Sequence, residues 1–402
     1  MKPVRVLILG WILLVPRVGA ARRGSTEEAS FYYGTFPPGF SWGVGSSAYQ
    51  TEGAWDQDGK GPSIWDAFTH GEKGTVLGDD TADAACDSYY KVQEDIALVK
   101  ELHVSHYRFS LSWPRILPTG VRAVHVNKRG IKFYSDFIDA LLQSNITPIV
   151  TLHHWDLPQM LQVTYGGWQN VNMTRYFREY ADLCFEVFGD RVKHWLTFSD
   201  PRTMVEKGYE TGLHAPGLRL QGTGLYMAAH HIIKTQYGDP LIYVTENGAS
   251  QKLHCTQLCD EWRIQYLKGY INEMLKAIKD GVNIKGYTSW SLLDKFEWEK
   301  GYADRYGFYY VEFNVRNKPR YPKASVQYYK EIITANGFPN PREVESWHLK
   351  ALETCSINNQ MLATEPLLRH MHVASEIVVP TVCVLSILIS ALLLTLLLRS
   401  HG

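Results

Sequence analysis

The sequence predicts an α/β protein built on a parallel β-sheet. Between about residues 31 and 338, short apolar segments alternate with amphipathic segments of helical period, a pattern typical of βαβ units with right-handed crossovers. One short segment, Leu241 to Val244, is apolar throughout, as in a strand buried on both faces. It leads to a carboxylate, Glu246, and the turn pair Asn247-Gly248. In α/β barrels such strand ends carry the chemistry, although this segment alone is better explained by a salt-bridged glutamate.

Six strands and five helices follow from the pattern of apolar residues. The predicted strands are Phe40–Gly45, His106–Trp113, Ile146–His153, Val192–Phe198, Leu241–Val244 and Ile284–Leu292. The predicted helices are Tyr89–Leu102, Ile131–Leu142, Tyr176–Phe188, Leu225–Lys234 and Trp262–Lys279. In the first helix, Val92, Ile96 and Val99 recur at helical spacing and line one face.

The two ends of the chain carry the marks of a membrane protein. Residues 1–20 combine basic residues, an apolar run and small residues, which predicts a signal peptide. Ile377 to Leu398 is apolar and long enough to cross a bilayer, and Arg399 follows it. We therefore expect a type I membrane protein of the endoplasmic reticulum or the cell membrane, with a lumenal or extracellular domain at 31–338. A stalk at 339–376 and a tail at 399–402 without a retrieval signal complete the prediction.

Composition and cysteine usage narrow the possible partners. Lys plus Arg and Asp plus Glu number 41 each, so no net charge favours nucleic acid. Aromatic residues make up 13% of the chain, which suits stacking on sugars but also ordinary large cores. Cys255 and Cys259 are candidates for a small disulfide loop. A zinc site would need a second pair of ligands nearby, and none is present in the sequence there. Neither a metal nor a cofactor is therefore expected. Asn145 and Asn172 begin glycosylation sequons.

Polar and aromatic residues recur at the C-terminal ends of all six predicted strands. One such residue is a structural detail, but the same placement on six strands is hard to explain as separate salt bridges. Opposed carboxylates among tryptophans and hydrogen-bonding residues are suited to breaking a glycosidic bond. The set is Gln50, Glu52, Arg108, His153, His154, Trp155, Asp156, Asp200, Glu246, Trp290, Asp294, Glu297 and Trp298.

The motifs that contain these residues resemble those of glycoside hydrolase family 1, in particular its membrane-anchored animal branch that includes the klothos. The resemblance covers nearly all of the predicted lumenal part, and its motifs together are highly specific. They are Phe40 to Gly53, Tyr107 to Arg115, Thr151 to Gln159, Tyr243 to Gly248 and Trp290 to Trp298. The resemblance implies a (β/α)8 barrel of the TIM type and β-glycosides or other carbohydrates as ligands, with a protein partner as a further option.

The resemblance also implies a role for each matching position. Glu246 matches the nucleophile of a retaining mechanism, and Arg108 matches the arginine that favours its ionised form. Trp290 matches the aromatic platform under the sugar. Gln50, His154, Glu297 and Trp298 match the residues that hydrogen-bond the sugar hydroxyls; for His154 and Trp298 the alternative is ordinary packing at the barrel mouth.

The first departure from the family pattern concerns the proton donor. The family has Thr-Phe-Asn-Glu-Pro on its fourth strand, with the glutamate as acid/base, whereas this chain has Thr197-Phe-Ser-Asp-Pro201. Asp200 is one methylene shorter, and a retaining site holds its carboxyl groups about 5 Å apart. Ser199 replaces the asparagine that in the family contacts the 2-hydroxyl. Since a general acid contributes typically about 10²–10⁴-fold, we expect weak or absent hydrolysis.

The second departure is a missing stretch between the fourth and seventh strands. Only 46 positions separate Asp200 from Glu246, whereas each βαβ step needs roughly 30 residues or more. The fifth and sixth βα units are therefore expected to be absent, as in a spliced form or a faulty gene model. Either the flanking strands pair in a smaller ring, or a gap exposes two apolar edges. Three functions stay open: a β-glycosidase, a catalytically inactive sugar- or protein-binding protein, and a non-functional isoform retained in the endoplasmic reticulum.

Overall fold

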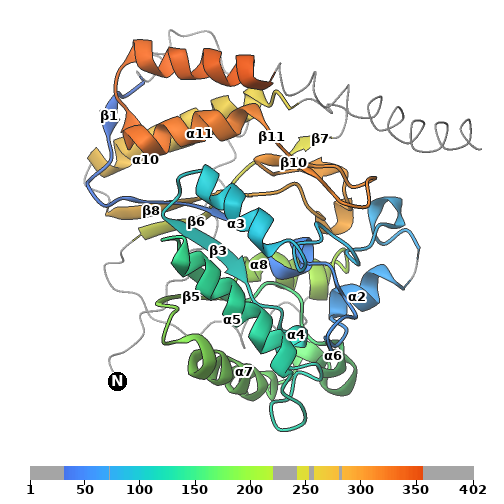
Figure 1. Cartoon of the computed structure of the whole chain (residues 1–402). Coiled ribbons are helices and arrows are strands. Elements are labelled where there is room, and N and C mark those ends of the chain that lie inside the picture. The colour runs from blue at the N-terminus through green and yellow to red at the C-terminus, as the bar shows by residue number, and fades with distance from the viewer. Residues whose placement is uncertain (1–30, 72, 221–241, 253–257, 280–282, 356–402) are drawn as a thin grey trace, which may run out of the picture.

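A computed structural model describes residues 31–71, 73–220, 242–252, 258–279 and 283–355. Its centre is a sheet of six parallel strands in the order β5-β4-β3-β2-β8-β6 (Figure 1). All six predicted strands are confirmed, with ends that differ by up to three residues. The strands are β2 (Ser41–Gly45), β3 (His106–Ser110), β4 (Thr147–His153), β5 (His194–Phe198), β6 (Ile242–Asn247) and β8 (Ile284–Trp290).

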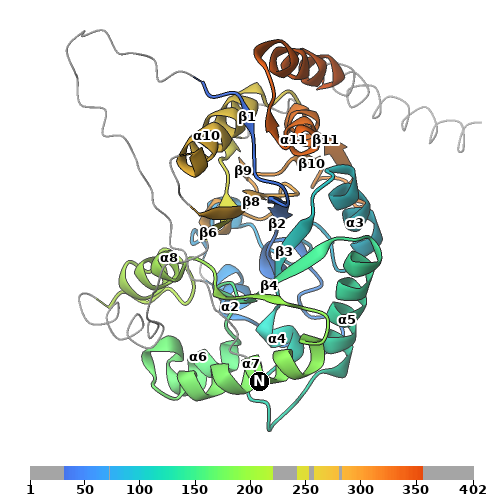
Figure 2. The ribbon, with the colours of Figure 1, turned by 90° about the vertical axis from the view of Figure 1, so that its left-hand side faces the viewer.

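In the part of the chain that the structure describes, the sheet curves like a barrel wall but does not close. Figure 2 shows the strands in an arc, with α3, α5 and α7 on its outer side. β5 and β6 are the two ends of the sheet order, and no strand of the described residues lies between them. All five residues of the central strand β3 are buried, whereas in β5 only Leu196 is. The structure is thus an open half-barrel, and of the two alternatives left by the sequence it has the gap and not the smaller ring.

Four of the predicted helices are present, and each packs an apolar face on the sheet or its neighbours. In α5, the side chain of Asn127 caps the helix by accepting a hydrogen bond from the Arg129 amide at 3.2 Å. Tyr134, Ile138 and Leu141 then recur at helical spacing and are buried. The longer helices are α3 (Val92–Glu101), α5 (Lys128–Gln143), α7 (Met173–Phe188), α10 (Glu261–Lys279) and α11 (Ala324–Ala335).

Shorter elements build the loops at the two ends of the sheet. Two antiparallel pairs join distant segments: β1 (Gly34–Thr35) with β12 (Gly337–Phe338), and β7 (Gln251–Lys252) with β9 (Asp304–Arg305). A third pair, β10 (Tyr309–Val311) with β11 (Arg320–Pro322), joins neighbouring segments. The short helices are α1 (Ala48–Thr51), α2 (Ile64–Thr69), α4 (Trp113–Ile116), α6 (Gln159–Tyr165), α8 (Pro201–Val205), η1 (Leu77–Asp79), η2 (Gly167–Gln169), η3 (Glu206–Glu210) and η4 (Trp298–Lys300). Of these, α1 and η4 follow β2 and β8 and carry the candidate site residues Gln50 and Trp298, and α8 follows β5 and is capped by Asp200.

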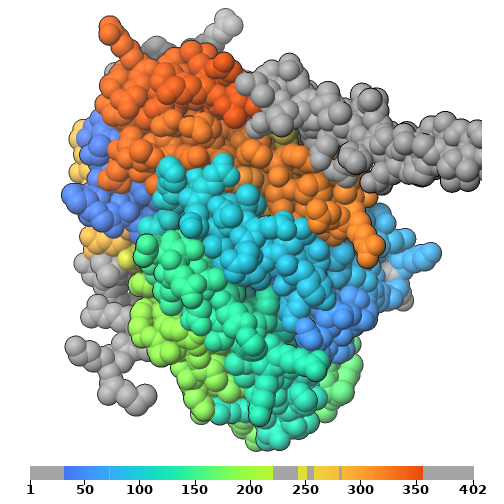
Figure 3. Space-filling view, viewed as in Figure 1, coloured from blue at the N-terminus to red at the C-terminus, as the bar shows by residue number. Residues whose placement is uncertain are grey.

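The first part of the predicted stalk is folded against the domain. Residues 341–355 form a helix that lies beside α11 in Figures 1 and 2, with the Trp347 ring 6.2 Å from that of Tyr328. Figure 3 shows the C-terminal described residues, orange to red, covering one end of the molecule. Val344, Trp347 and Ala351 are buried, so the packed domain extends past residue 338.

The predicted disulfide loop between Cys255 and Cys259 is wrong. Cys259 is instead bonded to Cys355, across a sequence separation of 96 residues. The bond ties the helix at 341–355 to the start of α10. Cysteine connectivity depends on which segments fold side by side, which the spacing of cysteines does not reveal.

Removal of this disulfide should weaken the fold. Because closing a loop of about 100 residues restricts the unfolded chain strongly, replacing both Cys259 and Cys355 with serine is expected to lower the free energy of unfolding by about 2–5 kcal/mol. Urea denaturation of wild type and variant measures the difference. A reducing agent should destabilise the wild type alone; equal stability of wild type and variant would contradict the prediction.

Several predicted segments lie outside the described residues. They are the signal peptide at 1–20, the helix Leu225–Lys234, the membrane span Ile377–Leu398 and the tail at 399–402, together with the stalk beyond residue 355. In the part of the chain that the structure describes, no helix is long and apolar enough to cross a membrane.

Candidate active site

Glu246 and Arg108 meet at the C-terminal mouth of the half-barrel. Glu246 lies near the end of β6, and its Oε2 accepts a hydrogen bond from Arg108 Nη1 at 2.5 Å. The same nitrogen donates to the Thr245 carbonyl at 3.3 Å, and Arg108 Nε donates to Thr151 Oγ1 on β4 at 3.3 Å. The Arg108 side chain is 3% exposed and that of Glu246 is 15% exposed. The guanidinium therefore compensates the carboxylate in a site with little access to water.

The turn after Glu246 is held tightly against the neighbouring strand. Tyr287 of β8 donates to Asn247 Oδ1 at 2.8 Å, and Asn247 Nδ2 donates to the Tyr266 hydroxyl at 3.1 Å. A Cβ atom at Gly248 would lie 1.9 Å from the Trp290 carbonyl oxygen, so only glycine allows this approach. The turn pair that marked the strand end in the sequence thus fixes the direction of Glu246.

Asp200 lies at the same mouth and also caps a helix. It directly follows Ser199, whose hydroxyl donates to Glu246 Oε2 at 3.2 Å. The Asp200 backbone is left-handed, with φ of 30°, and its Oδ1 accepts from the Thr203 amide at 3.1 Å. It therefore caps α8. Asp200, which the sequence assigns as proton donor, therefore has a shorter side chain than glutamate, and its carboxylate also accepts a hydrogen bond from the first turn of α8.

The predicted sugar-binding residues form one connected cluster beside this pair. Gln50 Nε2 donates to Glu297 Oε2 at 3.1 Å, and Lys295 forms an ion pair with Glu297. Lys295 Nζ also lies 4.8 Å from the centre of the Trp290 ring, and the Arg108 guanidinium lies 5.4 Å from it. The structure therefore links the predicted positions on α1, β3 and the loop after β8.

Burial changes the titration of Glu297. Desolvation raises the pKa of Glu297 to about 7, although the charge of Lys295 lowers it; Asp294 and Asp304 raise it further. At neutral pH the side chain is thus poised between a carboxylate, which only accepts hydrogen bonds, and a carboxylic acid, which also donates one.

This shift predicts a pH-dependent effect of Glu297→Gln on stability. Because the folded pKa of Glu297 lies above the ordinary value, the folded state binds more protons between about pH 4.5 and 7, and its stability falls as the pH rises through that window. Glutamine does not titrate, so the variant lacks this loss. Its free energy of unfolding, relative to that of wild type, should therefore increase by roughly 3 kcal/mol from pH 4.5 to pH 8. Urea denaturation across that range measures the difference; a difference independent of pH would contradict the prediction.

The aromatic residues pack on one another around His154. The His154 ring lies 5.9 Å from Trp290 and 5.8 Å from Trp298, and Trp298 is 4.6 Å from Trp155. Burial, together with the charges of Arg108 and Lys295, holds the pKa of His154 well below its usual value. The imidazole is therefore neutral and offers one donor and one acceptor to a ligand.

Four contributors to the site were missed by sequence reasoning. Lys295 lies inside the Trp290 to Trp298 motif, so its charge was visible although its pairing with Glu297 was not. His214 and Lys207 both bind Glu299, at 2.6 and 2.8 Å. Burial would raise the pKa of Glu299, but these two partners lower it to about 2. This cluster joins the segment after α8 to η4, which carries Trp298.

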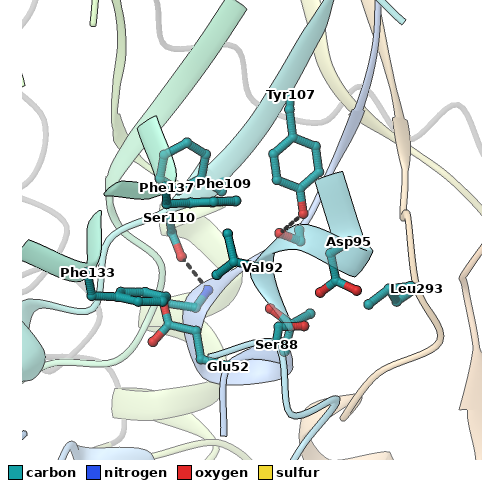
Figure 4. Close-up of a pocket in the computed structure, with 13 residues that line it drawn as sticks. Glu52, Ser88, Val92, Asp95, Tyr107, Phe109, Ser110, Phe133, Phe137 and Leu293 are labelled. Carbon is teal, nitrogen blue, oxygen red and sulfur yellow. Dashed lines mark hydrogen bonds between the residues drawn. The ribbon is translucent and has the colours of Figure 1, made fainter. Parts of the chain in front are cut away.

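A small cavity lies beside the site, not within it. It has a volume of about 30 Å³, enough for one water and not for a sugar. Figure 4 shows the carboxylates of Glu52 and Asp95 on one side of it, opposite the rings of Tyr107, Phe109 and Phe137. Neither Glu246 nor Asp200 lines this cavity. Of the other predicted positions, Asn145 and Asn172 are exposed at the surface.

Comparison with known proteins agrees with this architecture. The model of the family described as Glycosyl hydrolase family 1 matches residues 32–236 and 231–338. The chain belongs to glycosyl hydrolase family 1. It is 64% identical to the lactase-like protein of Mus musculus and 59% identical to that of Homo sapiens, and each alignment covers all of both chains. The family 1 b-glucosidase from Thermotoga maritima is similar in structure, with a TM-score of 0.70 and 31% identity over 75% of this chain and 99% of that chain.

The same comparisons locate the missing stretch of the family 1 barrel. The alignment with the mouse protein runs over 566 residues, whereas this chain has 402, so the mouse protein contains residues that this chain lacks. The family model matches in two pieces that meet at residues 231–236. This junction lies between β5 and β6, where the sheet is open.

Proposed function

We propose that this family 1 chain binds β-glycosides and hydrolyses them weakly or not at all. The observation that carries the proposal is the contrast between the two carboxylates. Glu246 has the buried arginine partner that a retaining nucleophile needs, with an Arg108 to Glu246 distance of 2.5 Å. Asp200 accepts the Thr203 amide at 3.1 Å and ends one methylene short of a glutamate. Attack on the sugar is thus supported better than protonation of the leaving group.

Turnover of aryl β-glucosides and β-galactosides by the purified full-length chain tests this proposal. We expect rates about 10²–10⁴-fold below those of a relative with a glutamate at the position of Asp200. Glu246→Gln, which keeps the shape of the side chain, should abolish what remains. Hydrolysis that survives this substitution would show that Glu246 is not the nucleophile. Hydrolysis as fast as that of the complete relative would show that Asp200 is an adequate acid.

Binding without turnover is the second candidate function, favoured by the intact cluster of Gln50, Glu297, His154, Trp290 and Trp298. Ligands that bind only the folded state raise its melting temperature, and the rise grows with the logarithm of the ligand concentration once this exceeds Kd. Thermal shift measurements with glucose and galactose derivatives therefore separate a sugar-binding protein from a chain with no ligand. A shift in wild type that Glu297→Gln removes supports binding at this cluster; no shift with any sugar would contradict it.

The open sheet also bears on localisation, which we propose to be the endoplasmic reticulum membrane, in type I orientation. Strand edges that are unpaired among the described residues, such as those of β5 and β6, promote association with other chains, and exposed apolar edges lead to retention of secretory proteins. We expect most molecules to carry glycans that endoglycosidase H removes. Asn145→Gln and Asn172→Gln identify the sequon that carries each glycan. Resistant, complex glycans on most molecules would contradict retention and favour the cell membrane.

A further inference from the structure

Two side chains span the open side of the half-barrel. β5 and β6 are the two ends of the sheet order among the described residues, yet Ser199, directly after β5, donates its hydroxyl to Glu246 Oε2 of β6 at 3.2 Å. The sheet is thus bridged at its mouth by side chains where backbone pairing is absent among the described strands.

The position of the Ser199 hydroxyl is fixed from several directions. The Ser199 amide donates to the His153 carbonyl at 3.0 Å, and Trp155 Nε1 donates to the Ser199 carbonyl at 3.0 Å. The hydroxyl oxygen accepts from Arg108 Nη2 at 2.9 Å. Ser199 is 4% exposed, so water does not compete well for these bonds.

The two contacts of the hydroxyl decide where its hydrogen points. Arg108 has only donors, so the serine oxygen must accept from it. The single hydroxyl hydrogen is then available for Glu246 Oε2, which also accepts from Arg108 Nη1. One carboxylate oxygen of Glu246 is therefore held by both neighbours. Its Oε1 has no hydrogen-bond partner among the described residues.

We propose that Ser199 is a positioning residue for Glu246, acting across the gap between β5 and β6. It holds Oε2 and so fixes the direction in which Oε1 faces the site. This inference rests on the proposed function in one respect, that Glu246 is the nucleophile; the contact itself does not depend on activity. The serine that replaces the family's asparagine thus takes part in orienting the carboxylate.

A double-mutant cycle on stability tests the contact without reference to catalysis. Urea denaturation is measured for wild type, Ser199→Ala, Glu246→Ala and the double variant of the full-length chain. Since a hydrogen bond to a charged group is lost once and not twice, we expect the unfolding equilibrium constants to depart from multiplicativity by about tenfold or more. Ser41→Ala combined with Glu246→Ala is the control. Its unfolding equilibrium constants should be multiplicative, because Ser41 hydrogen-bonds to His106 at the N-terminal end of β2, away from the mouth where Glu246 lies. Multiplicative constants for Ser199 would overturn the proposal.

Covalent labelling tests the positioning role. An activated 2-deoxy-2-fluoro β-glucoside with a 2,4-dinitrophenyl leaving group traps a nucleophilic carboxylate without help from a general acid. Ser199→Ala should lower the maximal labelling rate of Glu246 by about tenfold and leave the half-saturating concentration unchanged, and Ser199→Thr should restore the rate. If the double-mutant cycle shows coupling but wild type is not labelled, the contact between Ser199 and Glu246 is supported and the proposed function is wrong. Labelling of Ser199→Ala at the wild-type rate would overturn the positioning role.

Discussion

Asp200→Glu is expected to raise the hydrolysis of glycosides with poor leaving groups by about 10²–10⁴-fold. The added methylene restores the side-chain length of the family's glutamate, and in a retaining site a displacement of about 1 Å changes rates strongly. Steady-state kcat/KM for phenyl β-glucoside measures the gain. A 2,4-dinitrophenyl glucoside should show little gain, because its leaving group departs without a proton.

Two controls separate acid catalysis from a change in folding. Asp200→Gln has the length of glutamate but no proton of suitable acidity, so it should not raise the rate. Because Asp200 accepts from the Thr203 amide, Asp200→Glu should also cost about 1 kcal/mol of stability through the lost cap, which urea denaturation checks. An equal gain on both substrates, or no gain on either, would contradict the assignment of position 200 as the acid.

The strands and most helices were predictable because their local signals agree with the fold. The strands are short segments rich in aromatic and β-branched residues, although β3 also carries His106, Arg108 and Ser110, and each long helix has an apolar stripe. The helix at 341–355 was missed although Val344, Trp347 and Ala351 recur at helical spacing and are buried. The prediction for 339–376 was a stalk without helical periodicity, leading to a membrane span. The partner of Cys259 was beyond prediction, since it depends on that helix folding back.

The site was predictable one residue at a time but not as a set of contacts. The motifs name Glu246, Arg108 and Gln50, and the short spacing after Asp200 predicts the missing strands. The contact of Ser199 with Glu246 joins positions 47 residues apart, and it depends on how far the two sheet ends lie from each other. That separation follows from the curvature of the whole sheet, which no local pattern encodes.

Arg108→Met is expected to lower the free energy of unfolding by about 3–5 kcal/mol, because it leaves the half-buried Glu246 carboxylate without its cation. It also removes the donors to Thr151, Thr245 and Ser199, which link β3 to β4, to β6 and to the residue after β5. Urea denaturation measures the loss. Glu246→Gln in the same chain should restore part of it, since the unpaired charge is then gone.

A second buried arginine separates the structural part of this effect from the functional part. Arg115 is 1% exposed and donates to Glu52 Oε2 at 2.8 Å, so Arg115→Met should destabilise by a similar amount. Below the melting temperature, however, only Arg108→Met should prevent covalent labelling of Glu246, because Arg108 contacts that carboxylate and Arg115 does not. Equal loss of labelling in both variants would show that the site fails through general unfolding. Undiminished stability in Arg108→Met would show that the arginine does not hold the open half-barrel together at its mouth.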